Sequence, residues 1–192
     1  MNQIYAIRNE GVGYQFLDLT IMDVARNAPE DIPMDDILDF HLSNTSMATW
    51  WKAPETNFKS VEGEPASQIP DVSIWIDASL VLSPKAYRML HEPLQSSGEF
   101  LPVIVEGQTY YIFNCLTLGD EDKGNCKFEY IDDMPMGLET LRFQESSSNL
   151  LIFKSTLQSC LTLFCGNKFK DVIESFELTG ISFDENLIEI FE

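Results

Sequence analysis

The stretch from Leu80 to Leu118 constrains the fold more than any other part of this 192-residue chain. Ser83 followed by Pro84 is a strong start signal for a helix, because Ser caps the first turn and Pro suits the first helical position. Pro93 is expected to end this helix. The stretch therefore opens with one short, capped helix, and nothing in it indicates catalysis.

An apolar hairpin is predicted directly after that helix. The runs 99–105 and 109–118 flank the sequence Glu-Gly-Gln at 106–108, where Gly107 can supply the positive φ of a tight turn. Pro102 indicates that the first of the two strands lies at an edge or begins late, because Pro cannot donate to a ladder. Residues 126–130 alternate polar and apolar, which is typical of a half-buried strand. We expect these three strands to form a meander.

The rest of the chain also predicts short elements. Residues 4–7 and 14–19 are strand-like runs separated by a Gly-Val-Gly turn, which favours a hairpin. Helical spacing of apolar residues predicts one helix after Pro33 and another at 167–176 with Asn167 as its cap. Further strands are expected at 141–145, 150–154, 161–165 and 179–183, with a last strand or short helix at 186–192. The prediction is an α+β fold, mostly antiparallel sheet of short strands and hairpins, with a few short helices packed on it.

A polar, irregular connection from residue 43 to residue 70 separates the N-terminal strands and helix from the rest of the chain. We therefore expect an N-terminal strand and helix subdomain at 1–60 and a main α+β domain at 61–192. Trp50 and Trp51 lie in this connection. Packing in the core or between subdomains is the favoured role of the pair, and an exposed anchor for a partner is the alternative.

The charge of the chain limits its partners. The sequence has 12 Lys and Arg against 31 Asp and Glu, a formal net charge of −19. Such a surface repels phosphate, so nucleic acid and anionic membranes are disfavoured. The charge serves either solubility or complementarity to a basic protein partner. No secretory signal or membrane-spanning run is evident, so the expected location is the cytoplasm.

Known catalytic and metal-binding patterns are not fulfilled. His91-Glu92 lacks the second His of a zinc HExxH motif, because Gln95 stands there. The acidic turn at 120–125 has neither the glycine position nor the closing Glu of a calcium loop. Four cysteines without CxxC spacing predict buried, reduced thiols. The chain is expected to be no enzyme and to hold no cofactor or metal; an enzyme of unknown substrate and a homo-oligomeric structural module are the alternatives.

Several segments together resemble the bacterial immunity protein 11 family. The similar segments are LVLSPKAYRMLHEPL, GEFLPVIVEGQTYYIFNCL, LLIFK and GNKFKDVIESFELTGISF, which cover about residues 70–183. The chain departs from the family pattern at Lys154, where Arg is common, and after the hairpin, where the family's acidic motif is reduced to GDEDKG. The matching positions are Ser83, Ala86, Leu90, Leu94, Glu99 to Pro102, Tyr110, Tyr111, Asn114, Ile152, Phe153, Phe169, Leu178, Thr179, Gly180 and Phe183.

The resemblance implies a protein that binds a cognate bacterial toxin and blocks it. Its motif residues would hold the fold, and the toxin would meet other surface residues. Toxin domains that cut nucleic acid tend to be basic, so carboxylates could occupy their cleft in place of phosphates. The candidate contacts are Asp31, Asp35, Asp36 and Asp39 on the early helix, and Asp120, Glu121 and Asp122 at the hairpin tip; for each, a solvated face is the alternative.

Overall fold

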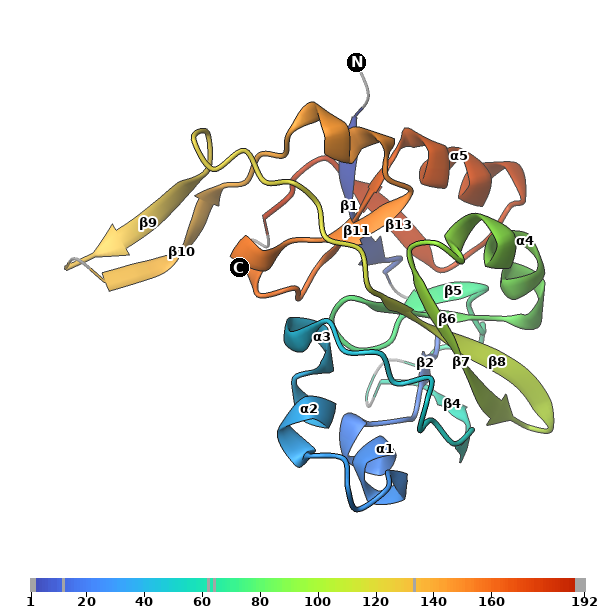
Figure 1. The fold of residues 1–192 in the computed structure, drawn as a ribbon. Helices are drawn as coiled ribbons and strands as arrows, with labels where there is room; N and C mark the ends of the chain where they lie inside the picture. Colours follow the sequence, from blue (N-terminus) through green and yellow to red (C-terminus); the bar gives the residue numbers. More distant parts are fainter. Residues whose placement is uncertain (1–2, 12, 62, 64, 133, 189–192) are drawn as a thin grey trace.

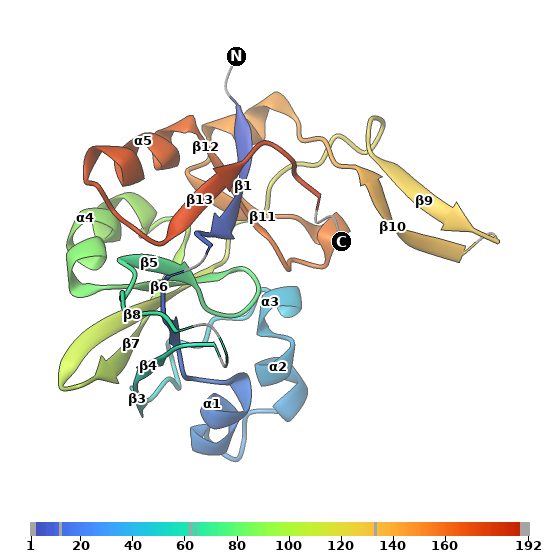
Figure 2. The same ribbon diagram turned by 180° about the vertical axis from the view of Figure 1, so that it is seen from behind.

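The computed structural model describes residues 3–11, 13–61, 63, 65–132 and 134–188, and it has the predicted α+β fold. Short strands form mostly antiparallel sheets, and short helices pack on them. Figures 1 and 2 show two main sheets, helices α4 and α5 together along one side, and a hairpin that projects from the body. Within the described ranges, no helix combines the length and apolar character needed to cross a bilayer.

The larger sheet contains the predicted hairpin. The turn between its two long strands has Glu106 at φ 50° and Gly107 at φ 77°, and Val105 pairs with Gln108 across it. A two-residue turn with both φ angles positive matches the twist of the strands. The strand order is β3 (Glu55–Thr56), β7 (Gly98–Val105), β8 (Gln108–Cys115), β6 (Ser79–Leu82) and β5 (Val72–Ile74), with only the β3–β7 pair parallel among them.

Helix α4 (Pro84–Leu94) forms where the sequence predicts it. The Ser83 hydroxyl accepts a 3.1 Å hydrogen bond from the Ala86 amide, which is the expected cap. Pro93 lies in the last turn, so the helix ends one residue after it. The buried side chains Ala86, Leu90 and Leu94 fix this helix on the sheet.

Both faces of the five-stranded sheet are buried. On β6, Leu80 and Leu82 enter a core shared with α4 and α5, whereas Val81 enters a second core under the N-terminal helices. Burial on both faces explains why the strand sequences are continuous apolar runs instead of alternating ones.

The smaller sheet joins segments from opposite parts of the sequence. Its order is β11 (Ile152–Lys154), β12 (Leu163–Gly166), β1 (Ile4–Asn9) and β13 (Ile181–Asp184), all antiparallel. Helix α5 (Asn167–Ser175) follows β12 and buries Phe169 and Ile173; Gly166, not Asn167, occupies its N-cap position.

The prediction that residues 4–7 and 14–19 pair as a hairpin is wrong. β1 pairs with β12 and β13, and β2 (Phe16–Leu17) pairs with β4 (Phe58–Lys59). Both faces of β1 are buried, with Ile7 in one core and Ala6 in another, so it takes a central place that a local hairpin could not give. The main-chain pairing of β1 with β12 and β13 therefore joins residues on both sides of position 60. The division of the chain into two domains at that position stays a prediction.

Three short helices cover the second core. They are α1 (Ile21–Asn27), α2 (Met34–Leu38) and α3 (Phe40–Ser43), and the predicted helix after Pro33 is thus confirmed as two pieces that meet at Asp39. Trp50 and Trp51 pack against this core, and the Trp51 indole donates a 2.8 Å hydrogen bond to the Pro102 carbonyl. Packing, not an exposed anchor, is therefore the structural role of the tryptophan pair.

The prediction that residues 126–130 add a third strand to the long hairpin is also wrong. β9 (Lys127–Ile131) leaves the larger sheet and pairs with β10 (Met134–Thr140) as a separate hairpin. Residues 141–145 form no strand, and the 3-10 helices η1 (Glu145–Asn149) and η2 (Thr156–Gln158) lie on either side of β11. Of the predicted last element, residues 189–192 lie outside the described residues, and residues 186–188 form neither strand nor helix.

Candidate functional site

The first acidic group lies on and beside α2, at the lower end of the molecule in Figure 1. All four of its carboxylates are exposed, and among the described residues none takes part in an ion pair or a side-chain hydrogen bond. They are Asp31, Asp35, Asp36 and Asp39. Ile37 on the opposite face of α2 is buried in the core, so the helix holds these carboxylates outward. This group is free to meet a partner.

The second acidic group does not lie at a hairpin tip, because residues 116–126 connect β8 to β9 across two different sheets. The Oε1 atom of Glu121 accepts hydrogen bonds from the Thr156 amide and hydroxyl, both at 2.8 Å, from the Ser155 hydroxyl at 3.0 Å and from the Leu157 amide at 3.3 Å. Burial raises the pKa of Glu121, but these hydrogen bonds outweigh it and lower the pKa.

The two carboxylates next to Glu121 also accept hydrogen bonds from side chains of this protein. The Asp120 carboxylate accepts from the Ser146 hydroxyl at 2.9 Å, and the Asp122 carboxylate accepts from the Asn125 amide at 2.7 Å. Asp120, Glu121 and Asp122 therefore stabilise the segment they belong to. In Figures 1 and 2 the segment leading into β9 starts beside α3 and runs away from α2 toward β9, so the two acidic groups do not form one surface.

Glu99 and Asn114, two of the positions singled out in the sequence, have structural roles. The Glu99 carboxylate accepts hydrogen bonds from the Met47 amide at 2.7 Å and the Ala48 amide at 3.1 Å. The buried Asn114 side chain donates to the same carboxylate at 2.8 Å and to the Thr45 carbonyl at 3.2 Å. Together they fix the segment after α3 on the edge of the larger sheet.

The two histidines are engaged in packing. His41 is buried, with Nδ1 3.3 Å from an Asp77 carboxylate oxygen, and burial raises the pKa of Asp77 against the opposing effect of His41. His91 lies against the rings of Tyr87 and Phe100 at 4.8 and 5.0 Å between centroids. Among the described residues, no group of three or more His, Cys, Asp and Glu side chains is placed to bind a metal ion.

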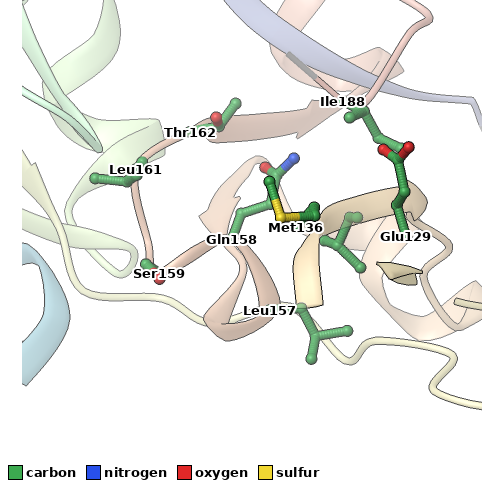
Figure 3. Close-up of a pocket in the computed structure, with 10 residues that line it drawn as sticks. Glu129, Met136, Leu157, Gln158, Ser159, Leu161, Thr162 and Ile188 are labelled. Atoms are coloured by element: carbon green, nitrogen blue, oxygen red, sulfur yellow. The ribbon is translucent and has the colours of Figure 1, made fainter. Parts of the chain in front are cut away.

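A cavity at the base of the β9–β10 hairpin was not predicted from the sequence. It has a volume of about 560 Å³ and lies between the β9–β10 hairpin and the segment from η2 to β12 (Figure 3). Its lining is mostly apolar, with a single carboxylate, and comprises Glu129, Met136, Gly137, Leu138, Leu157, Gln158, Ser159, Leu161, Thr162 and Ile188. The available sequence signal was the run Met-Pro-Met-Gly at 134–137, which places exposed methionines beside an acidic strand.

Two polar groups of this cavity are without an ionic or hydrogen-bonded partner in the described part of the chain. The Glu129 carboxylate forms no ion pair there, and Figure 3 shows it on the same side as Ile188. Gln158 donates through Nε2 to the Leu187 carbonyl at 2.9 Å, but its buried Oε1 has no hydrogen-bond partner. This Oε1 atom is buried from solvent, whereas the Glu129 carboxylate is exposed and open to a charged ligand.

A search of protein-family models and a search of curated proteins each found no match to this chain.

Proposed function

We propose that this chain is a non-catalytic immunity protein, which neutralises a basic bacterial toxin domain by binding it directly. The observation that carries the proposal is the group of four exposed carboxylates around α2, which no cation among the described residues neutralises. The formal net charge of −19 supports it, because such a field accelerates association with a positively charged protein.

The inhibition acts through charge complementarity. A toxin that cleaves nucleic acid binds phosphates in a positively charged cleft, and the carboxylates on α2 fill the same cleft in their place. The core behind α2 supports this role. Ile37 and Phe40 are buried beneath the helices and fix the backbone that carries the carboxylates, so little backbone order has to be gained on binding.

The proposed function predicts that a toxin domain is encoded next to the gene for this chain, and the test uses that domain. Both proteins are purified, and the dissociation constant is measured by calorimetry at 50 and 300 mM NaCl, together with growth of cells that express both. We expect a one-to-one complex that weakens at least tenfold at the higher salt concentration, and restored growth. No complex at 50 mM NaCl, or a complex in which the toxin stays active, would overturn the proposal.

Charge reversal locates the contact. The double variant Asp35→Lys/Asp36→Lys is expected to bind at least tenfold more weakly, with an unchanged unfolding midpoint, because both side chains are exposed. The matched control is Glu92→Lys/Asp171→Lys, which makes the same change in charge at exposed positions of α4 and α5. Equal losses in the two variants would show that only the total charge matters and that α2 is not the contact.

A further inference from the structure

The β9–β10 hairpin exposes an unusual concentration of large apolar side chains. Phe128, Tyr130, Met134 and Met136 are between 40% and 63% exposed, and all four lie on this one element. The hairpin projects away from the body in both ribbon views (Figures 1 and 2). Among the described residues, neither of its strands pairs with a third strand. Clustered aromatic and Met side chains of this kind mark protein interfaces.

The excess of carboxylates on the hairpin favours a basic partner. Exposed carboxylates of Glu129, Asp132 and Glu139 outnumber the single cation, Lys127, among its described side chains. An apolar centre with an acidic rim complements a partner that presents apolar side chains among basic ones. The same kind of partner is required by the proposed function.

The cavity at the base of the hairpin combines two chemistries that one side chain can satisfy. Met136, Leu138 and Leu157 provide apolar walls, which suit a hydrocarbon stem (Figure 3). Glu129 provides an exposed carboxylate that has no ion-pair partner among the described residues. Arginine carries an apolar stem and a planar group of donors that pairs with a carboxylate in two-point fashion.

We propose that this cavity receives an arginine side chain of the basic partner, whose stem lies on Met136 and Leu138 and whose guanidinium pairs with Glu129. This inference rests on the proposed function and adds a second contact, remote from α2. A cavity of about 560 Å³ is ample for one such side chain. Met136, an exposed apolar side chain of the hairpin, lines this anchor site and limits the access of water to it.

A small probe tests the cavity without the toxin. N-acetyl-arginine methylamide is titrated into the full chain with ¹³C-methyl methionine, and the Met136 methyl resonance is followed by NMR. We expect a saturable shift with a dissociation constant on the order of a millimolar, since few atoms are buried. The citrulline analogue, which has nearly the same shape and no charge, is expected to bind at least fivefold more weakly.

Two variants complete the probe experiment. Glu129→Gln is expected to weaken binding of the arginine probe at least fivefold, whereas Glu139→Gln is expected to change it less than twofold. Glu139 is an exposed carboxylate of the same hairpin that does not line the cavity. No saturable shift at Met136, equal binding of the citrulline analogue, or equal effects of the two variants would overturn the inference.

Binding to the adjacent-gene toxin separates this inference from the proposed function. Glu129→Lys is expected to lower the affinity for that toxin at least tenfold, and Glu139→Lys less than threefold. If the wild-type chain neutralises the toxin and Glu129→Lys binds it equally well, the cavity inference fails and the proposed function stands. If the wild-type chain does not bind the toxin, the proposed function fails, and the arginine probe alone decides the chemistry of the cavity.

Discussion

The ammonium group of Lys154 donates a 2.7 Å hydrogen bond to the main-chain carbonyl of His41. Lys154 is fully buried on β11 of the smaller sheet, whereas His41 belongs to α3, which covers the core beneath the larger sheet. Burial lowers the pKa of Lys154, and nearby thiols oppose this effect. The bond joins two parts of the fold that are far apart in sequence, so it fixes how they pack.

Replacement of Lys154 tests that bond. Lys154→Ala is expected to lower the free energy of unfolding by about 2–4 kcal/mol, because it opens a cavity and leaves the His41 carbonyl without a donor. The measurement is urea unfolding followed by circular dichroism. The control is Lys168→Ala at an exposed position of α5, with an expected change under about 0.5 kcal/mol. Equal effects would show that the buried bond contributes nothing.

The Glu121 carboxylate gives a pH-dependent prediction. Its folded pKa is lowered, so its contribution to stability is present above its unfolded pKa and is lost as the pH falls through the folded pKa. Glu121→Gln is expected to cost about 1–2 kcal/mol at pH 7, near the lower end because the group is partly exposed to solvent. Unfolding measured from pH 7 to pH 3.5 should show this difference shrinking below about pH 4.5. Glu145→Gln, at an exposed nearby position, should show no such trend.

Two glycines with positive φ are expected to differ in their tolerance of a side chain. At Gly180 (φ 108°), a Cβ atom would lie 2.3 Å from the Pro70 Cβ and 2.4 Å from the Val72 carbonyl oxygen. Gly180→Ala should therefore cost about 2–4 kcal/mol, from both clash and backbone strain. Gly107→Ala meets nothing within 4 Å and should cost about 1 kcal/mol. Thermal unfolding of both variants compares them; a smaller loss for Gly180→Ala would contradict the described packing.

The four thiols should react at different rates. Cys115, Cys160 and Cys165 are buried, as the sequence predicted, and Cys126 is partly exposed. Burial raises the pKa of Cys115 to about 12 and also raises those of Cys160 and Cys165, which suppresses their thiolates. Iodoacetamide at pH 8 should label Cys126 at least a hundredfold faster than the others, as peptide mass spectrometry would show. Labelling of Cys115 at a similar rate in the folded protein would contradict this.

Local signals in the sequence predicted local structure well. The Ser83 cap, the Glu106-Gly107 turn and the helical spacing from Phe169 to Phe176 each act within a few residues, and each element is confirmed. Pairing over long distances was predicted poorly. Ile4 to Ile7 looks like half of a hairpin, but the choice of β12 and β13 as its neighbours depends on which faces the completed cores bury.

The candidate sites show the same division. Exposure of the carboxylates on α2 follows from helical spacing, because the apolar positions of that helix determine which side faces the core. The role of Glu121 could not be predicted, since its four donors come from residues more than thirty positions later. The cavity beside Met136 was missed for the same reason, because three separate segments form its walls.

The central place of β1 has a consequence for biosynthesis. β1 is translated about 155 residues before β12 and about 175 residues before β13, the only described strands with which it pairs. At ordinary translation rates this strand waits roughly ten to thirty seconds with its apolar residues exposed and both of its edges open. During that interval its unpaired edges are open to chaperones, and the smaller sheet closes only after its latest-made strands have emerged from the ribosome.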